Sequence, residues 1–213
     1  MNDQSGTVGV EPAEQEQPII TGAADEPLLT DDVPPLRPPA PDQEEHAAGE
    51  LHIPDGYTVV EGSADGDGRT VGIVVARFNG EITGRLLESA LTALEEHGVP
   101  RDAVTVMPVP GAFELPLAAM ALAKTRRFAC VVALGAVIRG ETPHFDYVAG
   151  EAASGLQLAA LETGVPVSFG VLTCNTVAQA EARIDKAAEA VRTALEMASV
   201  FSQVRAKVNS GKS

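Results

Sequence analysis

The hydrophobic pattern of the chain changes abruptly at residue 70. Residues 70–78 are a nearly continuous apolar and β-branched run of strand length, typical of a strand buried on both faces of a parallel sheet. Apolar residues then recur at steps of three and four from Ile82 to Leu94 and stop before His97, which predicts a helix. We expect His97 to be a cation near the end of this helix and Gly98 to be its left-handed cap.

This strand and helix unit repeats three more times. The further strands are predicted at residues 104–109, 128–138 and 165–173, and the further helices at 114–124, at 143–162 and from Thr176 onward. Thr176 and Gln179 form a capping box at the start of the last helix, which we expect to be long and unbroken. Its expected apolar face consists of Val177, Ala180, Ile184, Ala187, Val191 and Leu195. Four such units predict an α/β fold, a three-layer αβα sandwich with a four-stranded parallel sheet of the flavodoxin-like type, over residues 68–213.

Residues 1–67 have the composition of a segment that cannot bury a core. They hold nine of the fifteen prolines and no aromatic residue before Tyr57. Residues 1–70 carry 16 acids and two basic residues, a net charge of −14, whereas residues 71–213 carry 14 acids and 13 basic residues, a net of −1. We therefore predict a disordered, acidic, proline-rich extension over residues 1–67. Its role stays open between a solubilising tail and an arm that docks a partner.

Several classes of protein are disfavoured by composition. The net charge of −15 argues against a general nucleic-acid binder, which needs a basic face for phosphates. Residues 1–5 lack the basic and apolar parts of a secretory signal, and the apolar run at 128–138 is too short to span a membrane. The two cysteines, Cys130 and Cys174, suit a reducing compartment, and Cys130 is expected to be an inert core thiol. We expect a cytoplasmic protein without a membrane segment.

Ligands of open parallel sheets bind outside the carboxyl ends of the strands, so those four ends are the candidate site. The third end is the most informative. Thr142 suits a helix N-cap and Pro143 the first helical position, so residues 140–142 should present backbone N–H groups and a hydroxyl that suit a phosphate. His144 would lie in the first helical turn, where the helix dipole favours a neutral ring that can accept a proton. His144 is either such a base or a structural residue.

The other strand ends add weaker signals. Phe78, at the first end, either stacks on a planar ring or packs within the protein. At the second end, Gly111 allows close approach of a ligand, while Phe113 and Glu114 are either site residues or an ordinary helix start. The sequence contains no glycine-rich nucleotide loop of the usual spacing, no Walker motif, no close metal-ligand spacing and no Gly-x-Ser-x-Gly. These absences argue against a nucleotide cofactor, a metal site and a serine hydrolase.

Four segments at these strand ends together resemble the lumazine synthase family, over roughly residues 70–200. They are RFN at 77–79, PGAFELP at 110–116, ALGAVIRGETPHFDYV at 133–148 and PVSFGVLT at 166–173. The resemblance implies a transferase of riboflavin biosynthesis that works without a cofactor. Its two small-molecule substrates are 5-amino-6-(ribitylamino)pyrimidine-2,4-dione and 3,4-dihydroxy-2-butanone 4-phosphate, and its products are 6,7-dimethyl-8-ribityllumazine, phosphate and water. The resemblance also implies a homopentamer, which in some members builds an icosahedral shell.

The resemblance assigns a role to each matching residue. The pyrimidine substrate would be bound by Phe78, Ala112, Phe113, Glu114, Val137, Ile138 and, from a neighbouring subunit, Phe169. The phosphate would be bound by Gly140, Glu141, Thr142 and the neighbour's Arg183. His144 would move protons during imine formation and phosphate elimination.

The chain departs from the family pattern after Arg183. A glycine-containing loop and a lysine usually follow this arginine, but here residues 184–188 continue the helical pattern, so the loop is expected to be deleted. Lys186 either replaces the usual lysine or is a solvated helix residue. Asn175 is expected to cap the last helix. A catalytically weak relative that serves as a shell or ligand-binding scaffold therefore stays open, and a flavodoxin-like electron carrier shares only the fold class.

Overall fold

The structure, a computed structural model, describes residues 51–210, and most of the predicted disordered extension lies outside the described residues. The described part of that extension, residues 51–67, contains no helix or strand. Its last residues contact the domain, since Gly66 N donates to His97 O at 2.8 Å and Gln203 Nε2 donates to Glu61 O at 2.6 Å. The boundary of the domain at residue 68 stays a prediction.

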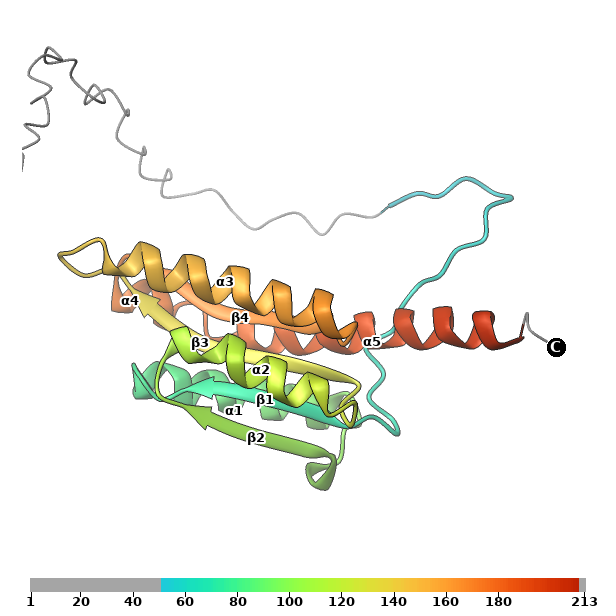
Figure 1. Ribbon diagram of the computed structural model, residues 1–213, viewed down its shortest axis with the longest axis horizontal. Coiled ribbons are helices and arrows are strands. Elements are labelled where there is room, and N and C mark those ends of the chain that lie inside the picture. The colour runs from blue at the N-terminus through green and yellow to red at the C-terminus, as the bar shows by residue number, and fades with distance from the viewer. Residues whose placement is uncertain (1–50, 211–213) are drawn as a thin grey trace, which may run out of the picture. The chain divides into compact units, whose positions relative to one another are not determined.

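Four parallel strands form the sheet (Figure 1). They are β1 (Val71–Ala76), β2 (Val104–Val109), β3 (Cys130–Ile138) and β4 (Val167–Cys174), in the order β2-β1-β3-β4. The connections contain the helices α1 (Gly80–Glu96), α2 (Leu115–Lys124), α3 (His144–Thr163), α4 (Val177–Glu181) and α5 (Lys186–Ser210), and the 3₁₀ turns η1 (Arg101–Ala103) and η2 (Ala112–Glu114). The predicted fold class is confirmed. No helix within residues 51–210 has the length and apolarity needed to cross a bilayer.

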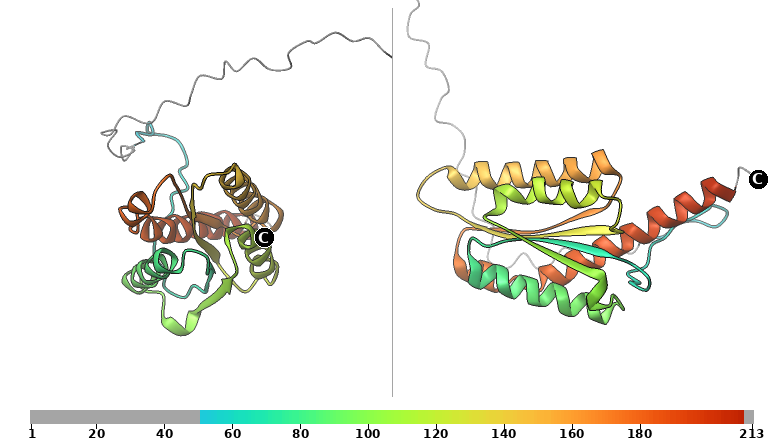
Figure 2. Two further views of the ribbon diagram at one scale, coloured as in Figure 1. Left: turned by 90° about the vertical axis from the view of Figure 1, so that its left-hand side faces the viewer. Right: turned by 60° about the horizontal axis from the view of Figure 1, so that its bottom comes forward.

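The sheet separates two apolar cores (Figure 2). Helices α1 and α5 cover one face and helices α2 and α3 cover the other. Alternate residues of β3 enter the two cores, as the period of a strand requires: Val132 lies on the α1 and α5 side and Val131 on the α2 and α3 side. Cys130 is fully buried, and burial raises the pKa of its thiol from 9.0 to about 12, in keeping with an inert core residue.

The last helix is broken, so the prediction of one continuous helix was wrong. Helix α4 ends at Glu181 and α5 begins at Lys186, with a turn at residues 182–185 between them. The turn is tightened by bonds that span three residues instead of four, such as Arg183 N to Ala180 O and Lys186 N to Arg183 O. Val177 is 53% exposed and does not belong to the predicted apolar face. The break occurs without any glycine between residues 171 and 210.

Asn79 joins the carboxyl ends of β1 and β3. Its side-chain Nδ2 donates to Ala136 O at 2.8 Å, and its backbone is left-handed, with φ of 59°. Asn79 O also accepts from the N–H groups of Ile82 and Thr83, so this residue sets the start of α1. One side chain therefore fixes the first strand end relative to the centre of the sheet.

This geometry predicts an order of stabilities for two variants. Asn79→Ala should lower the free energy of unfolding by about 2 kcal/mol, because it loses a hydrogen bond worth about 1 kcal/mol and because alanine lacks the short polar side chain that makes asparagine tolerant of the left-handed conformation, a further cost of about 1 kcal/mol. Asn79→Gly should cost only about 1 kcal/mol, since glycine adopts this conformation freely. Urea denaturation measures both. Equal losses, or a larger loss for glycine, would contradict the assignment.

Candidate active site

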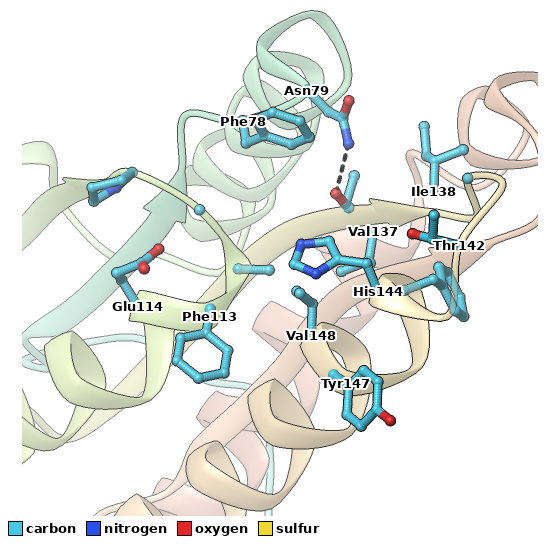
Figure 3. Close-up of a pocket in the computed structure, with 16 residues that line it drawn as sticks. Phe78, Asn79, Phe113, Glu114, Val137, Ile138, Thr142, His144, Tyr147 and Val148 are labelled. Carbon is cyan, nitrogen blue, oxygen red and sulfur yellow. Dashed lines mark hydrogen bonds between the residues drawn. The ribbon is translucent and has the colours of Figure 1, made fainter.

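The carboxyl ends of β1, β2 and β3 enclose a pocket of about 690 Å³ (Figure 3). The three ends meet because the strands are parallel neighbours in the sheet. The residues that line the pocket are Phe78, Asn79, Pro110, Gly111, Ala112, Phe113, Glu114, Ala136, Val137, Ile138, Gly140, Thr142, His144, Phe145, Tyr147 and Val148. Nine of the predicted site residues are among them: Phe78, Ala112, Phe113, Glu114, Val137, Ile138, Gly140, Thr142 and His144.

One part of the pocket is aromatic. Phe78 is 72% exposed and Phe113 is 57% exposed, so neither packs into the core. The backbone of Phe78 is fixed on both sides. Its N–H donates to Pro110 O at 3.0 Å, and the next residue, Asn79, is hydrogen-bonded to β3. Exposed aromatic faces at the rim of a pocket suit a planar ligand that stacks on them. Of the two interpretations of Phe78 from the sequence, packing within this chain is therefore excluded.

A carboxylate lies next to this aromatic part. Glu114 closes the turn η2, where its N–H donates to Gly111 O at 3.3 Å, and its side chain is half-buried. A Cβ placed on Gly111 would lie 3.2 Å from Glu114 Oε2. Gly111 therefore leaves room for this carboxylate at the pocket wall, where it can accept hydrogen bonds from hydroxyl or amino groups.

The other part of the pocket is the start of α3. The close-up shows the imidazole of His144 directed from the first turn of α3 toward the middle of the pocket, between Phe113 and Thr142 (Figure 3). The prediction that Thr142 caps this helix was wrong: α3 begins at His144, Pro143 precedes it in a helical conformation, and no side chain of the described residues caps it. Asp146 N instead donates to Pro143 O at 3.0 Å.

The residues before α3 leave space for a ligand. A Cβ placed on Gly140 would meet no atom within 4 Å, and its φ is not positive, so neither packing nor backbone conformation requires glycine here. Thr142 and His144 are exposed, and within residues 51–210 no other side chain bonds to theirs. Exposed N–H and hydroxyl donors at the N-terminus of a 20-residue helix suit an anionic group.

Arg139 holds this loop and was not identified from the sequence. Its Nη2 and Nη1 donate to Asp146 Oδ1 at 2.8 Å and Oδ2 at 3.2 Å, and its Nε donates to Asn175 Oδ1 at 3.1 Å. The guanidinium lies 4.2 Å from the ring centre of Phe145. The hydrogen bond with Asp146 raises the pKa of Arg139, which is charged at any ordinary pH. The side chain of Asn175 thus accepts from Arg139 and does not cap the helix as expected. Thr176 Oγ1 caps α4 instead, accepting from Gln179 N at 3.2 Å.

Four predicted site residues lie outside this pocket. Glu141 is exposed and directly follows Gly140 of the lining, and Phe169 lies on β4 and is 46% exposed. Arg183 lies in the turn between α4 and α5, where Nη1 donates to Gln179 O at 2.9 Å. Lys186 is exposed and its Nζ lies 2.6 Å from Glu189 Oε1. Within one chain, these four residues do not line the pocket into which His144 points.

Two of the additional lining residues could have been found from helix spacing. Tyr147 and Val148 follow His144 by three and four residues, and therefore lie on the same face of α3. Asn79 could not have been found in this way, because its bond to Ala136 joins residues 57 positions apart. No group of three or more His, Cys, Asp or Glu residues within residues 51–210 could hold a metal ion.

Cys174, the last residue of β4, lies at the same end of the sheet. Burial raises the pKa of its thiol, and the positive charge of Arg183 partly offsets this effect. At neutral pH the thiol is therefore protonated, which makes it a poor nucleophile. We assign Cys174 a packing role in the core formed with α5.

Comparison with protein families agrees with this geometry. Residues 68–202 match the family model described as 6,7-dimethyl-8-ribityllumazine synthase. The matched segment includes all four strands and every residue that lines the pocket. The chain belongs to the 6,7-dimethyl-8-ribityllumazine synthase family.

Proposed function

We propose that this protein catalyses the last condensation that forms 6,7-dimethyl-8-ribityllumazine in riboflavin biosynthesis. The substrates are 5-amino-6-(ribitylamino)pyrimidine-2,4-dione and 3,4-dihydroxy-2-butanone 4-phosphate, and phosphate and water are released. The observation that carries the proposal is one pocket with an aromatic part and a helix N-terminus, from which the imidazole of His144 points toward the middle of the pocket. This arrangement matches one planar substrate and one phosphorylated substrate.

The pyrimidine substrate would occupy the aromatic part. Phe78 would stack on its ring, and Phe113 would cover the ring or the first part of the ribityl chain. Glu114 would accept hydrogen bonds from ribityl hydroxyls, and the backbone around Ala112 would contact the same chain. Val137 and Ile138, at the end of β3, would contact the heterocycle through their backbone groups.

The butanone phosphate would occupy the start of α3. Backbone N–H groups near Gly140 and Glu141 and the hydroxyl of Thr142 would bind its phosphate, which stabilises the charge that develops as phosphate leaves. The pyrimidine amine attacks the ketone, and loss of water from the adduct gives an imine. Both the loss of water and the later phosphate elimination need proton transfers. The imidazole of His144 points toward the middle of the pocket, where it would lie between the two substrates (Figure 3).

Phe169 and Arg183 suit a site shared between subunits of a homopentamer. They lie outside the pocket of their own chain, and Phe169 is 46% exposed on an edge strand. Helices α2 and α3 also expose Leu117, Leu158 and Leu161, which favours burial against another subunit. The neighbour's Arg183 would complete the phosphate site with a guanidinium, and Lys186, three residues later, lies near enough in sequence to assist it. Whether pentamers associate further into an icosahedral shell is left to a mass measurement.

Replacing His144 tests the catalytic assignment. His144→Ala should lower kcat by about 10²- to 10⁴-fold, because a general acid and base is lost while the binding surfaces remain. Formation of the fluorescent lumazine from both substrates measures the rate. The matched control is His97→Ala, at the end of α1 and outside the pocket, which should keep the wild-type rate.

Two results would contradict these assignments. An undiminished rate in His144→Ala would remove His144 from the mechanism. A wild-type protein that binds both substrates but forms no lumazine would favour a ligand-binding scaffold instead of an enzyme.

Mixing two inactive variants tests the shared site. His144→Ala and Arg183→Ala should each be nearly inactive alone. Co-expressed in one oligomer, they should recover up to about a quarter of the wild-type activity, because some sites then combine an intact His144 with a neighbour's intact Arg183. Light scattering should give the mass of a pentamer or a multiple of it. A monomer, or a mixed oligomer without recovery, would contradict the shared site.

A further inference from the structure

One arginine closes the base of the loop that leads from β3 to α3. Arg139 directly follows β3, and Asp146 is the third residue of α3. The fork of two hydrogen bonds between them, at 2.8 and 3.2 Å, joins the two ends of the segment that contains Gly140, Thr142 and His144. The ion pair therefore links the first and last residues of this loop and closes it at its base.

The guanidinium is itself fixed from other directions. Its Nε donates to Asn175 Oδ1 at 3.1 Å, and its plane lies over the ring of Phe145 at 4.2 Å. The backbone N–H of Arg139 donates to Cys174 O at 2.9 Å, which continues the pairing of β3 with β4. Arg139 thus connects the sheet, the start of α3 and the segment before α4.

In the part of the chain that the structure describes, no other side-chain bond fixes this loop. Within residues 51–210, the side chains of Glu141, Thr142 and His144 form no hydrogen bond or ion pair with the rest of the chain. All three are exposed. The positions of the donors in the loop and of the imidazole therefore depend on the backbone that Arg139 and Asp146 hold.

We propose that Arg139 is a positioning residue, which acts through Asp146 and Asn175 to hold the anion-binding loop and His144 in the geometry that the reaction needs. The inference rests on the function proposed above and adds a residue to it. A lysine cannot replace Arg139, because a single ammonium cannot form the two-pronged bond to a carboxylate and a third bond to an amide at once.

The presence of Asp146 supports a positioning role over a purely electrostatic one. A carboxylate in the first turn of α3 lies near the proposed phosphate, where its charge alone would repel the substrate. The pair is also solvent-exposed, with 43% of the Arg139 side chain and 57% of the Asp146 side chain accessible, and exposed pairs add little to global stability. The pair therefore contributes mainly to the local order of the loop.

The test compares two arginines in similar exposed pairs. Arg139→Lys should lower kcat by at least about tenfold, toward the roughly 100-fold that a displacement of about 1 Å costs. The matched control is Arg101→Lys, whose ion pair with Glu95 spans 2.5 Å at the turn η1, outside the pocket, and which should keep the wild-type rate. Both variants should keep the wild-type melting temperature within a few degrees.

Binding of inorganic phosphate to the full-length protein, measured by titration calorimetry, gives a readout that does not depend on activity. Asp146→Asn removes a negative charge, so electrostatics alone predicts tighter phosphate binding. The positioning role predicts weaker binding, by about the same factor as in Arg139→Lys, and no further loss when the two substitutions are combined. Tighter binding in Asp146→Asn, or a wild-type rate in Arg139→Lys, would overturn the proposal. If the wild-type protein forms no lumazine, the proposed function fails, while the phosphate titration still decides the role of Arg139.

Discussion

The structure depends on one constraint, the burial of β3 inside a parallel sheet. This strand has a neighbour on each side, and eight of its nine residues are buried. Each neighbour runs in the same direction as β3, so the carboxyl ends of the strands meet at one edge of the sheet. Asn79 reaches β3 from one side and Arg139 leaves it on the other, and both parts of the pocket therefore adjoin the end of this strand.

The order of strands and helices could be predicted from the sequence because buried parallel strands and amphipathic helices have distinct periods. Six of the nine predicted pocket residues followed from their places at the strand ends, whereas Ala112, Val137 and Ile138 were predicted from the family resemblance. The break before α5 could not, because residues 182–185 carry no glycine or proline and keep a helical pattern. Only the bonds around Arg183 distinguish a tight turn from a continued helix.

Contacts between residues far apart in the sequence could not be predicted either. The bond from Arg139 to Asn175 joins positions 36 residues apart, and each side chain has an ordinary local explanation, a strand end and a helix cap. Phe169 and Arg183 lie outside the pocket of their own chain, so strand-end reasoning could not connect them with it, and their roles were predicted from the family resemblance. The proposed anion site would depend on local donors, because residues 71–213 carry a net charge of only −1 and supply no general positive field.

The central claim is that the carboxyl edge of the sheet binds a planar ring and a phosphate in two adjoining parts of one pocket. A crystal structure of the protein with a pyrimidine substrate analogue and inorganic phosphate tests this claim most directly. We expect the ring to lie against Phe78 and the phosphate to contact the loop at Gly140 and Thr142, with His144 between them. A ring or phosphate bound away from this edge, with the pocket empty, would contradict the account.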